Sequence, residues 1–79
     1  MLLATKAEAL FISSLQPSQR PTAEQVTAAI RASLRSHGGA GGCAGACAAE
    51  FGEHPDTARD RMKWALAAVA RGHSATCSA

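Results

Sequence analysis

Alanine is the most abundant residue of this chain, and it limits which folds the chain can form. The 79 residues include 19 alanines but only 15 larger apolar residues, counting Leu, Val, Ile, Met, Phe and Trp together. Alanine has the highest helix propensity, whereas the β-branched and aromatic residues that favour strands are scarce here. The sequence therefore predicts an all-α fold, a small four-helix bundle in which helices approach closely and each contact buries little apolar area.

Start and stop signals divide the chain into helices. Thr5 and Thr22 each begin a capping box, with Glu8 and Gln25 in the position that returns a hydrogen bond to the cap. We expect a single domain over residues 1–72 and a disordered tail over residues 73–79. The expected helices cover about residues 6–15, 22–36, 43–51 and 55–70.

Glycine and proline separate the last two of these helices. Gly52 follows an apolar residue. Glycine adopts the left-handed backbone conformation that ends many helices at little energetic cost. Pro55 suits the first position of the next helix, and Asp56 lies in its first turn. We therefore expect a tight turn at Gly52, whereas the glycine-rich run over residues 38–42 is expected to be a flexible connector.

The outer helices carry apolar residues on more than one face. In the first helix, Leu10, Phe11 and Ile12 cover more than one side, which favours deep packing. In the last helix, Trp64 lies almost opposite the main apolar stripe. Two interpretations of Trp64 stay open: it packs under another helix of this chain, with the first helix as the expected partner, or it anchors a partner or dimer contact.

The segment over residues 48–58, AAEFGEHPDTA, is similar to the core of bacterial helix-turn-helix regulators. Ala48 matches the small residue of the first helix, Phe51-Gly52 matches the turn, and Thr57-Ala58 matches the start of the recognition helix. Glu53 departs from the pattern, because a branched apolar residue is usual there. The alanine- and arginine-rich character also resembles short actinobacterial proteins, a likeness that implies no function.

The resemblance implies a trihelical DNA-binding core, with the helix near residues 22–36 as its first helix. DNA binding in transcription control is then the leading hypothesis. The expected contacts are made by Thr57, Arg59, Arg61 and Lys63 at the major groove, and by Arg31 and Arg35 at the backbone. The formal net charge of +2 is small for such a role, and acids and bases cancel over residues 50–71. Useful affinity would therefore need a homodimer or a second protein.

The alternative is a small helical protein-interaction module that binds no DNA. Its expected interface consists of Trp64 and the apolar residues Leu10, Phe11 and Ile12 of the first helix. A surface with a basic ridge along the last helix would favour DNA, and an exposed apolar patch would favour a protein partner.

No catalytic or metal signature is present in the sequence. His54 lies near Glu53 and Asp56, but carboxylates beside a turn histidine commonly cap a helix, so we expect no enzyme activity. Cys43 and Cys47 share a helix face without a second close pair of ligands, so we expect small buried thiols and no metal or other cofactor. Three cysteines without a secretion signal or a membrane-length apolar run indicate a reduced, cytoplasmic protein.

Overall fold

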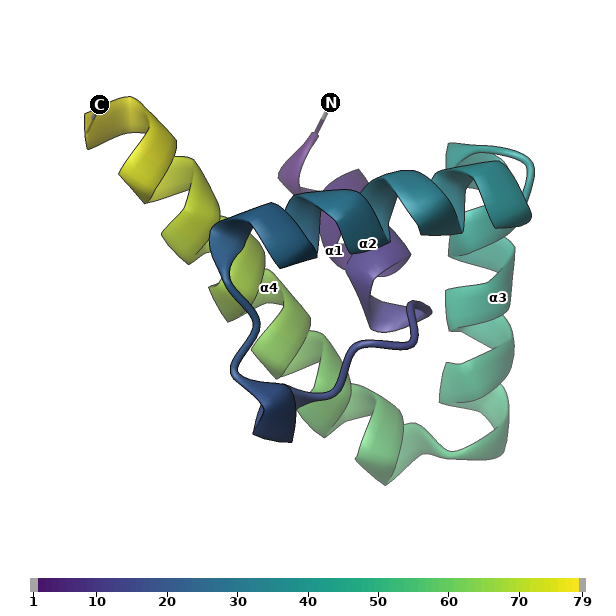
Figure 1. The fold of residues 1–79 in the computed structure, drawn as a ribbon. Helices are drawn as coiled ribbons and strands as arrows, with labels where there is room; N and C mark the ends of the chain where they lie inside the picture. The colour runs from purple at the N-terminus through teal and green to yellow at the C-terminus, as the bar shows by residue number, and fades with distance from the viewer. Residues whose placement is uncertain (1, 79) are drawn as a thin grey trace.

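The computed structural model describes the backbone of residues 2–78 and the side chains of residues 2–71. It is 81% helical, and the described residues form no strand, so the predicted all-α small bundle is confirmed. The elements are α1 (Leu3–Phe11), a short 3-10 turn η1 (Pro17–Gln19), α2 (Ala23–Ser36), α3 (Ala40–Glu53) and α4 (Pro55–Ser78). In Figure 1, α2 crosses in front of α1, while α3 and α4 form two sides that meet at one corner.

Helix α1 is the centre of the molecule. It packs against α2, α3 and α4 alike, and its second half is buried on every side. Leu10 is fully buried and Phe11 is 3% exposed. The prediction that this helix packs deeply is therefore confirmed. It is the hub of the bundle, however, and not an addition laid across a three-helix core.

The two ends of α1 differ from the predicted ends. The helix begins at Leu3 after an N-cap at Leu2 that makes no side-chain hydrogen bond, so the predicted capping box at Thr5 is wrong. It ends at Phe11 and not at Leu15. The hydroxyl of Ser13 donates to the Leu10 carbonyl at 2.6 Å, a local bond that competes with continuation of the helix.

Helix α2 has the predicted boundaries. The Thr22 hydroxyl accepts from the Gln25 amide at 3.1 Å, and the Gln25 side chain accepts from the Thr22 amide at 2.8 Å, which confirms this capping box. Val26 and Ile30 are buried, and Leu34 packs against the core, as the apolar stripe predicts.

Two glycines reverse the chain between α2 and α3. Gly38 and Gly39 have φ values of 75° and 100°, a region that L side chains avoid. The Gly39 amide donates to the Leu34 carbonyl at 2.8 Å, the bond that closes a glycine-capped helix C-terminus. The glycines that follow are helical, because α3 begins at Ala40. The expectation of a flexible connector over residues 38–42 is therefore wrong.

The corner between α3 and α4 is a single residue, His54. Gly52 lies inside α3 and has no left-handed conformation, so the predicted stop at Gly52 is wrong. The cause is Pro55, which disfavours a helical conformation for the residue before it. Pro55 begins α4 and Asp56 lies in its first turn, as predicted.

Helix α4 continues to Ser78, beyond the predicted end near residue 70. The side chains of residues 72–79 lie outside the described part, so the predicted disordered tail stays a prediction. Within the described residues, no helix combines the length and the apolar character that crossing a bilayer would require.

Candidate functional site

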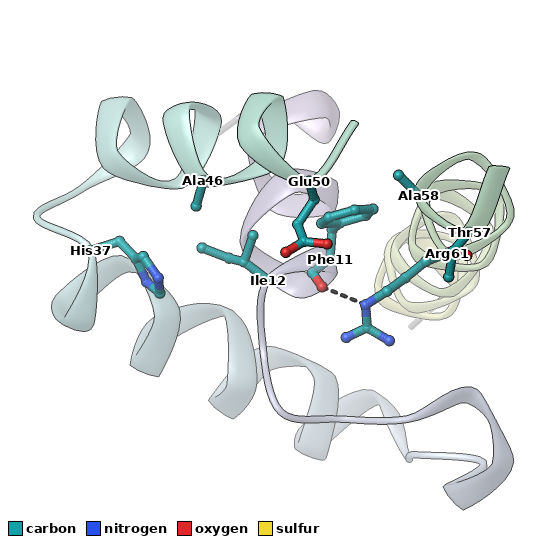
Figure 2. Close-up of a pocket in the computed structure, with 8 residues that line it drawn as sticks. All are labelled: Phe11, Ile12, His37, Ala46, Glu50, Thr57, Ala58 and Arg61. Carbon is teal, nitrogen blue, oxygen red and sulfur yellow. Dashed lines mark hydrogen bonds between the residues drawn. The ribbon is translucent and has the colours of Figure 1, made fainter. Parts of the chain in front are cut away.

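A cavity of about 310 Å³ opens where the C-terminal ends of α1 and α2 meet α3 and the start of α4. Helices α1, α3 and α4 contribute to its lining together with the C-cap residues of α1 and α2, as Figure 2 shows. Its volume lies at the lower end of the range for small-ligand pockets, roughly 300–1,000 Å³. The lining residues are Phe11, Ile12, His37, Ala46, Glu50, Thr57, Ala58 and Arg61.

The apolar part of the lining is supported by the core. Phe11 is buried, and its ring stacks on Phe51 with centroids 5.7 Å apart and planes 15° from parallel. Phe51 is itself 37% exposed, so the stack reaches from the core to solvent. Ile12 is half-buried, and Ala46 and Ala58 leave open space because their side chains are short. This arrangement suits an apolar side chain or ring of a ligand.

Arg61 forms one wall and holds the end of α1 in place. Its Nε donates to the Phe11 carbonyl at 2.5 Å, and its Nη2 donates to the carbonyls of Ser13 at 3.0 Å and Leu15 at 2.9 Å. The guanidinium carbon also lies 5.0 Å from the ring centroid of Trp64. Burial lowers the pKa of Arg61 from its ordinary value, yet an arginine remains charged under such conditions. The side chain therefore caps a helix C-terminus.

Three further polar groups surround the cavity. The Glu50 side chain extends from α3 toward its middle, beside Phe11 and Ile12 (Figure 2). His37 caps α2, and its Nδ1 lies 3.1 Å from the Ser33 carbonyl. Thr57 lies in the first turns of α4. Glu50, His37 and Thr57 are exposed to solvent, so a ligand in the cavity can contact each of these side chains directly.

The predicted DNA-contacting residues do not form one surface. Arg61 is held by three backbone carbonyls, which contradicts its predicted role at the major groove. Arg59 and Lys63 are exposed on α4, but Asp56 and Asp60 are exposed within one turn of them. Thr57 lines the cavity.

Arg31 and Arg35 are the predicted contacts that lie on α2, where Arg31 also lines a depression with Glu24. Both are exposed on α2, spaced by four residues and therefore on one face. Lys6 of α1 and Arg31 line the same surface depression, together with Thr27 and Ile30. A basic surface thus lies on α1 and α2, whereas the predicted ridge lies on α4.

The residues of the predicted protein interface do not form one exposed patch. Leu10 and Phe11 are core residues, because three other helices surround α1. Ile12 and Trp64 are half-buried against the core, so Trp64 packs within this chain while part of its surface stays open. His37 and Glu50 line the cavity but are not among the residues predicted to form a site. The spacing of Ala46 and Glu50 by one helical turn is the pattern that pairs them on one face of α3.

Cys43 and Cys47 are buried core residues, as predicted. The Cys47 Sγ donates to the Glu8 carbonyl at 3.4 Å. Burial raises the pKa of the Cys47 thiol to about 11, and the nearby Glu8 carboxylate adds to the rise. Burial likewise raises the pKa of Cys43. In the part of the chain that the structure describes, no three His, Cys, Asp or Glu side chains converge as metal ligands.

Comparison with known proteins finds no matching family model, no matching curated protein and no matching solved structure. The helix-turn-helix resemblance thus stays a prediction. The one-residue corner at His54 is shorter than the turn of roughly 3–4 residues that is typical of such units.

Proposed function

We propose that this chain is a small helical protein-interaction module that binds a segment of a partner protein in the cavity between α1, α2, α3 and α4. The observation that carries the proposal is the stacked pair of Phe11 and Phe51, which continues from the core to an exposed edge beside an open cavity. Buried aromatic anchors next to accessible apolar pockets are typical of interaction hot spots. We place this activity in the cytoplasm, because the buried cysteines are free.

Selection from a phage-displayed peptide library on the immobilised full chain tests this proposal. Thr57→Trp places a large ring at the mouth of the cavity, because Thr57 is exposed and lines it. Ala67→Trp is the matched control, since Ala67 is exposed on the same helix outside the lining. We expect peptides with a large apolar anchor that bind the wild type and the control and lose binding to Thr57→Trp. Equal binding to both variants, with both folded by circular dichroism, would refute the proposal.

DNA binding remains a second candidate, and the basic surface of Lys6, Arg31 and Arg35 favours it. This surface presents few cations, so the affinity of one copy would be low and would fall steeply with salt. Fluorescence anisotropy with a labelled DNA duplex at low salt tests it. Binding that disappears in the double variant Arg31→Ala/Arg35→Ala and persists in Arg59→Ala would support contact through α2. No anisotropy change at high micromolar protein would exclude this candidate.

A further inference from the structure

Resting on the proposed function, we infer that the cavity binds a basic segment of a partner protein. An apolar side chain of that segment occupies the space beside Phe11 and Ile12. A neighbouring Lys or Arg of the segment meets the carboxylates of Glu50 and Glu53.

The carboxylates lie on the helix face that borders the cavity. Glu50 is part of the lining, and Glu53 follows Ala46 and Glu50 at a spacing that keeps the three on one face of α3. Glu50 and Glu53 are both exposed. Helix α3 therefore presents two negative charges at the mouth of an apolar space.

The cations near the cavity are directed away from these carboxylates or engaged elsewhere. The Arg61 guanidinium donates to the carbonyl of Phe11 at the C-terminal end of α1, which carries the negative end of the helix dipole, and to the carbonyls of Ser13 and Leu15 in the loop after it. Arg59 is two residues from Thr57 and therefore points away from the face that Thr57 shares with the cavity. His37 directs one ring nitrogen toward the Ser33 carbonyl. A basic segment is thus complementary to the rim, and an acidic one is not.

The charge of the whole chain does not produce this preference. Its formal net charge is +2, which repels a basic peptide weakly at long range. A preference for basic peptides would therefore be caused by the carboxylates at the cavity. If peptides bound indiscriminately to the surface, acidic peptides would bind more tightly than basic ones.

Three peptide libraries test the inference on the full chain. Each contains a central Leu, Phe or Trp anchor, and the flanking positions are limited to Lys and Arg, to Asn and Gln, or to Asp and Glu. We expect the basic library to yield the tightest binders. Affinity of these peptides, measured by fluorescence anisotropy, should fall about tenfold in Glu50→Gln/Glu53→Gln, because two exposed charge pairs are lost. Glu24→Gln, an exposed carboxylate on α2, is the control and should leave affinity unchanged.

The outcomes separate this inference from the proposed function. Neutral or acidic winners that are still blocked by Thr57→Trp would overturn the basic partner and keep the interaction site. Basic winners that are insensitive to Glu50→Gln/Glu53→Gln would overturn it as well. The absence of any peptide that Thr57→Trp blocks would refute the proposed function itself. Sedimentation velocity tests whether a second copy of the chain occupies the cavity instead. Self-association of the wild type that is lost in Thr57→Trp and in Arg31→Ala/Arg35→Ala would show that it does, and would overturn the inference.

Discussion

At the scale of single residues, Arg61 has the most consequential contacts. It joins α4 to a stretch of chain that is 46 to 50 residues away in sequence. The Phe11 carbonyl at the end of α1, and the Ser13 and Leu15 carbonyls of the loop after it, all accept hydrogen bonds from this one side chain. The sequence showed Arg61 as one of several cations on a helix, because charge and spacing alone do not reveal which arginine faces a backbone.

Replacing Arg61 tests this role. Arg61→Met keeps much of the apolar stem and removes the donors, so we expect a loss of about 1–3 kcal/mol in the free energy of unfolding. Arg59→Met, on an exposed position of the same helix, should change it by less than about 0.5 kcal/mol. Urea denaturation followed by circular dichroism measures both. Similar values for the two variants would contradict the capping role of Arg61.

At the scale of elements, helix boundaries were predictable where side chains near in sequence decide them. The capping box of Thr22 and Gln25 and the start of α4 at Pro55 are of this kind. The predicted stop at Gly52 failed because glycine only permits a left-handed turn, whereas Pro55 enforces the break one residue before itself. The length of α1 was only partly predictable, since its end involves both the local bond of Ser13 and Arg61 of a distant helix.

The junction of α2 and α3 gives a matched pair of glycine variants. A Cβ at Gly42 would collide with the backbone carbonyl of His37, whereas a Cβ at Gly45 would meet nothing within 4 Å. Both glycines lie in α3. Gly45→Ala should stabilise the protein by about 0.5–1 kcal/mol through helix propensity. Gly42→Ala should destabilise it by about 1–3 kcal/mol, because the backbone of the junction must shift.

Thermal or urea denaturation of the two variants measures this difference. Stabilisation of both by a similar amount would show that the close approach between Gly42 and His37 does not persist in solution.

At the scale of the whole molecule, the fold class was predictable and the arrangement was not. Alanine content and apolar periodicity predicted a helical bundle, and the several apolar faces of α1 predicted deep packing. The set of helices that surrounds α1 depends on contacts between segments far apart in the sequence. No local sequence pattern predicts such contacts. The cavity is a product of the same arrangement, because its lining residues come from α1, α3, α4 and the C-cap of α2, with no more than three from any one helix.

The buried thiols make global stability depend on pH in the alkaline range. Folding raises the pKa of Cys47 from 9.0 to about 11, so the native state retains a proton that the unfolded chain releases. The stabilisation is complete below pH 9 and is lost as the pH rises toward 11. We expect a contribution on the order of 1–2 kcal/mol from this thiol.

Urea denaturation at several pH values between 8 and 11 measures the decline. Cys47→Ala should be less stable than the wild type at pH 8, because it leaves a small void, and should lose less stability as the pH rises. An equal decline in both proteins would show that Cys47 does not cause it.

The reach of Arg61 to carbonyls at least 46 residues earlier has a consequence for synthesis on the ribosome. The end of α1 and the loop after it leave the exit tunnel long before the arginine that fixes them. Helices α2 and α3 can cover part of α1 earlier, but the side of α1 that packs on α4 stays uncovered until α4 follows, so nascent chains must delay their final packing. We therefore expect the chain to gain full protease resistance in one late step, only after residue 61 has emerged from the tunnel.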